Sequence, residues 1–315
     1  MSSVPQAPGD TGFTSARKRR GDTIFAGLSL SAGVTILVVL FLVAAFLVWQ
    51  ALPAITAAPE EVRGGQGLVH YIAPLLFGTV VAAVIALVVG TPLAIGIALF
   101  ISHYAPRRLA SLLGYIIDLL AAVPSVIFGL WGFYVFGPWL MPTQQGLIEY
   151  LGVIPLFGGP ASPKSMLVTG LVLAIMILPI MTAVNREVFL QTPRLHEEAS
   201  LALGATRWEM IKQAVIPFSK SGIISGAMLG LGRALGETMA VAIILSASAR
   251  FTPVITSSAN PGTIAGDIAL QFPESSGLDV NTLIASGLVL FFLTLLVNMF
   301  ARWIVSRRSE FSGAN

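Results

Sequence analysis

The chain has 315 residues, of which 55% are hydrophobic and only 10% charged, with a mean hydropathy of +0.85 and a formal net charge of +3. Soluble domains carry about 25% charged residues, so the composition excludes an ordinary soluble protein and predicts an all-α integral membrane protein. Cysteine is absent, and the histidines His70, His103 and His196 show no metal-ligand spacing, so no metal site is expected.

The N-terminal residues 1–22 are rich in Ser, Pro, Gly and Thr and carry the basic cluster Arg17-Lys18-Arg19-Arg20. This composition predicts a disordered cytoplasmic tail. The apolar run that follows, residues 24–49, is too long for the core of a signal peptide and lacks a convincing cleavage site. It is therefore expected to be an uncleaved first membrane span.

Five more apolar runs have the length of a bilayer crossing. They are residues 72–101, 109–140, 166–184, 222–247 and 283–305. Residues 23–308 are thus expected to form a six-helix transmembrane domain, with 309–315 as a cytoplasmic tail. With the N-terminus inside, the inner segments hold fourteen Lys and Arg residues, against three in the outer loops: Arg63, Lys164 and Arg250. This asymmetry predicts a multi-pass protein with both termini cytoplasmic.

Two features of the chain leave alternatives open. In the third run, Asp118 precedes Pro124, so either an in-plane helix begins near Pro106 and keeps Asp118 at the cytoplasmic interface, or a straight span buries Asp118 against a basic partner. In the last outer loop, residues 263–270 form either two amphipathic turns on the membrane surface or an irregular loop.

A polar stretch, residues 192–217, interrupts the apolar sequence on the inner side. Thr192-Pro193 predicts a helix start, with Thr192 as the capping residue and Pro193 at the first helical position. Glu197 and Glu198 fall in the early turns of this helix, and Gly204 is suited to end it. Thr206 and Glu209 have the spacing of a capping box, which predicts a second helix up to Ile216 that Pro217 stops. Small residues at the bend suit close approach by another protein, although an ordinary solvated loop has the same spacing.

The fifth run contains Arg233 and, four residues later, Glu237. In a continuous helix these side chains share a face, so they form either a self-compensating pair or a station for an anion. Arginine presents a planar fork that matches phosphate or carboxylate oxygens, and Glu237 would weaken the binding enough for release. The pairs Gly226 and Gly230, and Gly232 and Gly236, are expected to serve helix packing.

The polar stretch resembles the signature loop of permease subunits of ABC importers. The residues that carry the resemblance are Glu198-Ala199-Ser200, Gly204, Ala214 and Ile216-Pro217, with small departures at Ser200, Ala214 and Ile216. The resemblance implies the type I permease fold and a cytoplasmic coupling helix that docks on an ATPase. It assigns that contact to Glu197, Glu198, Ala199, Gly204 and Pro217.

A narrower resemblance lies in residues 230–241 and 122–132, which look like permeases of the phosphate-specific importer (PstC type). It implies that Arg233 and Glu237 act in phosphate passage in a bacterial cytoplasmic membrane. It also implies a different second permease (PstA type), two ATPase subunits that bind ATP and Mg, and an extracytoplasmic phosphate-binding protein. No cofactor or nucleic acid partner is expected.

Other functions fit the sequence less well. No Gly-Lys dipeptide occurs, so the chain has no Walker A loop, and ATP hydrolysis is expected in partner subunits rather than in this chain. All three histidines fall at span ends or in loops, which disfavours an intramembrane hydrolase. An importer of another oxyanion (sulfate, molybdate or phosphonate) is the main alternative. A proton-coupled carrier that titrates Glu237 and Asp118 would leave the signature loop unexplained.

Overall fold

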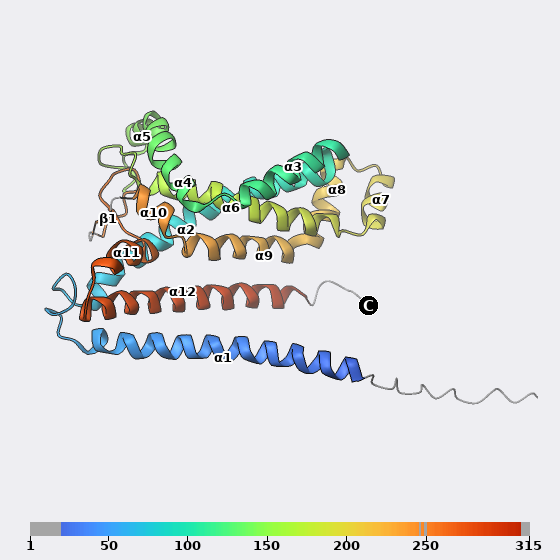
Figure 1. Cartoon of the computed structure of the whole chain (residues 1–315). Helices are drawn as coiled ribbons and strands as arrows, with labels where there is room; N and C mark the ends of the chain where they lie inside the picture. The colour runs from blue at the N-terminus through green and yellow to red at the C-terminus, as the bar shows by residue number, and fades with distance from the viewer. Residues whose placement is uncertain (1–19, 246, 249–250, 310–315) are drawn as a thin grey trace, which may run out of the picture. The chain divides into compact units, whose positions relative to one another are not determined.

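The computed structural model describes residues 20–245, 247–248 and 251–309 (Figure 1). Most of the predicted tails, residues 1–19 and 310–315, therefore lie outside the described residues. The chain divides into two units, Met1–Phe46 and Leu47–Asn315. The first unit is the N-terminal part of helix α1 (Arg20–Thr56), in which every side chain from Ile24 to Val43 is exposed, as expected of a helix that faces lipid.

Six helical segments in the described part of the chain are long and apolar enough to cross a membrane, which confirms the predicted number. They are Ile24–Thr56, Leu68–Tyr104, Ser125–Leu151, Met166–Leu190, Arg207–Leu235 and Leu278–Ile304. The fold is all-α apart from one short parallel pairing, in which β1 (Ala247–Ser248) meets β2 (Asn260–Pro261).

Helix α6 (Met166–Leu190) is the centre of the second unit. Its side chains Val172, Leu173 and Ile177 are almost fully buried, and they pack in one core with the small residues of α2 (Leu68–Leu99). Ser165 caps the start of α6 by accepting from the amide of Val168 at 3.3 Å. An apolar helix enclosed on several sides in this way needs small neighbours, which explains the alanines of α2.

Helix α9 (Ile216–Leu235) packs on α6 through a row of glycines. A Cβ atom at Gly222 would lie 2.4 Å from Val188, and one at Gly230 would lie 2.6 Å from Met181. Both distances are shorter than van der Waals contact, so only glycine allows this helix separation. The last helix, α12 (Leu278–Ser309), packs through Ala285 and Leu288 against Ala51 and Ala54 near the end of α1.

The predicted third span, residues 109–140, is wrong as a single helix. Helix α3 (Arg107–Ala121) ends before Pro124, and a second helical segment begins after it. That segment consists of α4 (Ser125–Trp131), the π-helical turn η2 (Gly132–Phe136) and α5 (Gly137–Leu151). Pro124 lacks an amide hydrogen and disfavours a helical residue before it, so the chain breaks there. Helix α5 continues to Leu151, beyond residue 140, where the predicted span ends.

The last loop contains a packed helix, α11 (Ile264–Gln271), followed by the 3-10 turn η4 (Phe272–Glu274). The predicted helical turns are therefore confirmed and the irregular loop is wrong, but Ile264, Ala265, Gly266 and Asp267 are buried, so the helix does not lie free on a surface. The Tyr71 hydroxyl of α2 donates to the Asp267 carboxylate, and Arg63 donates to Gln271. Burial raises the pKa of Asp267, while the hydrogen bond from Tyr71 lowers it.

Candidate functional site

The polar stretch forms two short helices, α7 (Arg194–Ala202) and α8 (Arg207–Met210), at one end of the second unit (Figure 1). Gly204 between them has φ +88°, a conformation that favours glycine, so the predicted left-handed residue is confirmed. The capping box is also confirmed: the Thr206 hydroxyl accepts from the Glu209 amide at 3.3 Å, and the Glu209 carboxylate accepts from the Thr206 amide at 2.8 Å.

The start of α7 differs from the prediction. Pro193, not Thr192, is the residue before the first turn, and no side chain caps the helix. The Thr192 hydroxyl is buried and has no hydrogen-bond partner among the described residues. Since the proline fixes its own backbone in a conformation compatible with a helix start, the helix begins without the threonine cap.

The two helices expose apolar side chains along with the predicted coupling residues. Glu198, Ala199 and Gly204 are exposed, and Glu197 is half-buried. Leu203 is 91% exposed, Leu195 77% and Trp208 57%. Large apolar side chains grouped on a surface mark sites of contact with another protein. No motif in the sequence singles out these three residues, although apolar side chains within a charged stretch are a visible signal.

A small hydrophobic core holds these helices to the ends of the longer ones. Met210, Ile211 and Val215 are buried together with Phe189 of α6 and Leu99 of α2. These residues form a cluster separate from the main core around α6. The coupling segment, as we call residues 192–217, is thus fixed to the ends of α2 and α6 by apolar packing.

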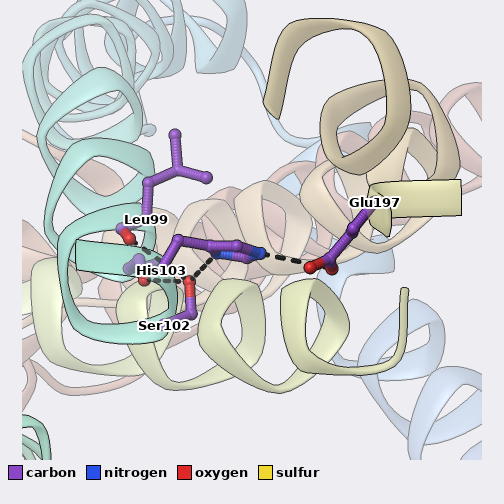
Figure 2. A network of polar contacts seen from close by, with 5 residues as sticks. Leu99, Ser102, His103 and Glu197 are labelled. Carbon is purple, nitrogen blue, oxygen red and sulfur yellow. Dashed lines mark hydrogen bonds and ion pairs between the residues drawn. The ribbon is translucent and has the colours of Figure 1, made fainter. Parts of the chain in front are cut away.

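A polar contact adds to this attachment (Figure 2). The π-helical turn η1 (Phe100–Tyr104) at the end of α2 carries His103, whose Nε2 lies 3.5 Å from Oε1 of Glu197 on α7. Its Nδ1 lies 2.7 Å from the Ser102 hydroxyl, which donates to the Ala98 carbonyl at 2.8 Å. A protonated imidazole donates at both nitrogens and therefore satisfies both contacts. The sequence placed His103 at a span end and gave it no role.

Pro217 does not stop the second helix, contrary to the prediction. A π-helical turn, η3 (Ile211–Val215), connects α8 to α9, and Pro217 lies in the first turn of α9. In this turn the Ile216 amide donates to the Ile211 carbonyl, five residues back. The hydrogen-bond pattern is already shifted there, so the missing proline amide costs the helix little. The coupling segment therefore continues into the membrane helix without a break.

The predicted fifth span, residues 222–247, is also wrong as a single helix. Helix α9 ends at Leu235, and α10 (Met239–Ile244) starts after Gly236, Glu237 and Thr238. Glu237 accepts from the Ala240 amide at 3.1 Å and so caps α10. Glycine is a poor helix former and a capping side chain competes with the helical ladder, so Gly236 and Glu237 together favour the break.

Because of this break, Arg233 and Glu237 do not form the self-compensating pair. Arg233 is half-buried in the last turn of α9, and its Nε is buried without a hydrogen-bond partner in the described residues. Among all the residues that the structure describes, the ion pair found is the one between His103 and Glu197. A half-buried guanidinium that forms no ion pair with a described residue favours the other interpretation, a station for an anion.

Space for a ligand exists next to Arg233. A Cβ atom at Gly232 would meet nothing within 4 Å, and one at Gly236 would meet only the Gly232 carbonyl, at 3.5 Å. Within the described chain this glycine pair packs against no other helix, whereas Gly226 and Gly230 pack against α6 as predicted. Irregular backbone at membrane depth is tolerated where it lines a cavity or is buried in protein.

Asp118 lies apart from both sites. It is exposed on α3, ahead of the break at Pro124, and forms no ion pair with a described residue. Helix α3, which is separate and ends before Pro124, fits the interpretation of an in-plane helix that begins near Pro106. The other interpretation, a straight span that buries Asp118 against a basic partner, is wrong for the described chain.

The chain matches proteins of known families over most of its length. Residues 90–310 match the family model of the inner membrane component of binding-protein-dependent transport systems. The phosphate transport system permease protein PstC 2 of Mycobacterium tuberculosis is 43% identical over 300 residues, which cover 91% of this chain and 92% of the relative. PstC of Mycobacterium leprae is 45% identical over 279 residues, or 84% and 87%. The chain belongs to the PstC family.

Solved structures show the fold of this PstC family member to be that of type I ABC importer permeases. A chain of a bacterial ABC transporter involved in the import of the polysaccharide alginate superposes with a TM-score of 0.58 at 15% identity. The match covers 91% of this chain and 96% of the other. A chain of the MetNI methionine ABC transporter gives a TM-score of 0.50 at 17% identity, with coverages of 76% and 95%. The predicted fold class is confirmed.

Proposed function

We propose that this chain is the transmembrane permease subunit of an ATP-driven importer that translocates inorganic phosphate. The observation that carries the proposal is the 43% identity, over 91% of the chain, to a phosphate transport system permease. The half-buried, unpaired guanidinium of Arg233 at the end of α9 supports it from the structure, because a phosphate passing through the membrane needs a cationic group to offset its desolvation.

In this mechanism Arg233 binds two phosphate oxygens through its planar fork, and the space at Gly232 and Gly236 admits the anion. Glu237 stays on the cap of α10 rather than neutralising Arg233. Its negative charge nearby limits how tightly the anion is held, since a transport site must also release its substrate.

The partners follow from the exposed surface of the coupling segment. Glu197, Glu198, Ala199, Gly204 and Pro217 belong to the segment that contacts one of two ATPase subunits, with Leu203 and Trp208 as apolar anchors. ATP and Mg bind to those subunits. A PstA-type permease completes the pathway, and an extracytoplasmic binding protein delivers phosphate. Both termini lie on the cytoplasmic side, in keeping with the distribution of Lys and Arg.

The test is uptake of labelled phosphate by vesicles that contain this chain, the second permease, the ATPase and the binding protein, with sulfate and molybdate as competitors. We expect ATP-dependent uptake that prefers phosphate. Arg233→Gln should reduce uptake by roughly tenfold or more, because a charge-assisted hydrogen bond contributes about 1.5–3 kcal/mol. Lys220→Gln removes an exposed cation from the same helix and serves as the matched control.

Each result has a definite meaning. Full uptake by the Arg233→Gln variant would remove the anion station. Preference for sulfate or molybdate would keep the importer and replace the substrate. Uptake without ATP would overturn the mechanism.

A further inference from the structure

An open cavity of about 500 Å³ lies between helix α3, the end of α2 and the last turns of α6. Its lining includes two arginines, Arg107 of α3 and Arg186 of α6, together with Ser111, Gly114 and Asp118 of α3. The phosphate pathway proposed above uses none of these residues. The cavity is next to the coupling segment, since Ser102, which contacts His103, also lines it.

Helix α3 has two chemically different faces. Arg107, Ser111, Gly114 and Asp118 follow one another at intervals of four, three and four residues, so they form one stripe along the helix, and all of them line the cavity. Leu112, Ile116 and Leu119 are exposed on the rest of the surface. An amphipathic helix with an exposed apolar side suits the boundary between headgroups and acyl chains.

The geometry around Arg186 leaves its charge available. A Cβ atom at Gly114 would lie 2.6 Å from Nη1 of Arg186, so the guanidinium occupies the space that a side chain on α3 would fill. Neither Arg186 nor Arg107 forms an ion pair with any residue that the structure describes. Two cations thus share a cavity with one carboxylate, Asp118, three helical turns from Arg107.

We propose that this cavity binds the headgroup of an anionic phospholipid. Arg107 and Arg186 bind the phosphodiester, because guanidinium groups match phosphate oxygens and basic pockets between membrane helices accept lipid headgroups. Asp118 repels the phosphate and accepts hydrogen bonds from hydroxyl groups farther along the headgroup. A glycerol headgroup, as in phosphatidylglycerol, meets both requirements. The site is independent of the substrate that the pathway carries.

The experiment uses the assembled importer, reconstituted in discs of equal parts phosphatidylcholine and phosphatidylglycerol. The phosphatidylglycerol that remains bound after delipidation is counted by native mass spectrometry. Arg107→Gln and Arg186→Gln should each lower retention about fivefold, the effect of about 1 kcal/mol per basic residue. Arg108→Gln is the matched control, since Arg108 is exposed beside Arg107 and does not line the cavity.

A second variant and a competitor complete the test. Gly114→Leu fills the cavity without removing a charge and should also lower retention, with Arg186 moving aside. Equal losses in all three arginine variants would mean diffuse attraction by surface charge and would overturn the site. Displacement of the lipid by inorganic phosphate, but not by chloride at the same ionic strength, would show a free-phosphate site. Absence of bound lipid in the unaltered complex would mean that a partner subunit covers the cavity.

Discussion

Two groups of glycines in and just after α9 have opposite surroundings. Gly222, Gly226 and Gly230 lie against α6, where a Cβ atom at Gly222 or Gly230 would clash with that helix and one at Gly226 would lie 3.1 Å from Asn185. Gly232, near the end of α9, and Gly236, just after it, border open space in the described chain. The first group fixes the position of α9, and the second group leaves Arg233 accessible.

The difference shows that glycine spacing alone does not distinguish packing from access. Both pairs, Gly226 and Gly230 as well as Gly232 and Gly236, have the same four-residue interval. The neighbouring side chains make the difference: Met181 and Val184 of α6 lie next to the first pair, whereas no described residue approaches the Cβ position of Gly232. Variants at the two kinds of glycine should therefore have different effects.

The largest difference is expected between Gly222→Leu and Gly232→Leu. Leucine at position 222 would overlap Val188, and overpacking of this kind costs typically about 1–3 kcal/mol. Leucine at position 232 meets nothing near its Cβ and improves helix propensity by up to about 1 kcal/mol. Thermal unfolding of the purified variants measures both. Equal melting temperatures would contradict the distinction between glycines packed against α6 and glycines that border open space.

The next effect concerns the break after α9. Glu237→Ala removes the cap of α10 and should cost about 1 kcal/mol of stability, whereas Glu237→Gln keeps an acceptor and should cost less. In a double-mutant cycle, Arg233→Gln and Glu237→Gln should be additive in stability to within about 0.5 kcal/mol. A larger interaction energy would mean that the two side chains pair after all.

A smaller effect is expected where the coupling segment meets α2. His103→Ala removes the contact with Glu197, a pair of partly buried side chains, which we expect to contribute about 1 kcal/mol. We expect up to about a fivefold rise in ATP hydrolysed per phosphate imported, because the segment is held less firmly. The control is His196→Ala, because His196 is an exposed histidine on α7, the helix that carries Glu197. If both variants hydrolyse the same amount of ATP per phosphate imported, His103 has no positioning role.

The smallest effect is expected at Pro217. Since the π-helical turn before it has already shifted the hydrogen bonds, Pro217→Ala should change the stability by no more than about 0.5 kcal/mol. Circular dichroism and thermal unfolding provide the measurement. A gain of several kcal/mol would show that the proline strains the helix.

Much of the fold could be predicted from the sequence, because long apolar runs and local caps depend on nearby residues. The number of spans, the capping box at Thr206 and the left-handed Gly204 are of this kind. The break at Pro124 agrees with one of the two interpretations that the sequence left open, whereas the break at Gly236 was not predicted, since hydropathy continues through it. At Gly236 the break depends on how Glu237 caps the next helix, which no apolar pattern reveals.

The candidate site was predicted in part. The sequence pointed to Arg233 and to the coupling segment, but not to their surroundings. The contact between His103 and Glu197 joins residues 94 positions apart in the chain, and the separation from Glu237 depends on the end of α9. Contacts between distant segments carry no local pattern, so they became visible only in the folded chain.

The π-helical turn η3 has a mechanical consequence. From Arg207 to Leu235 the chain is helical for 29 residues without interruption, a rod of about 43 Å at 1.5 Å per residue. One end of the rod belongs to the coupling segment, and the other end carries Arg233. We expect it to act as a lever: a tilt of about 10° around its Arg207 end would move Arg233 by roughly 7 Å.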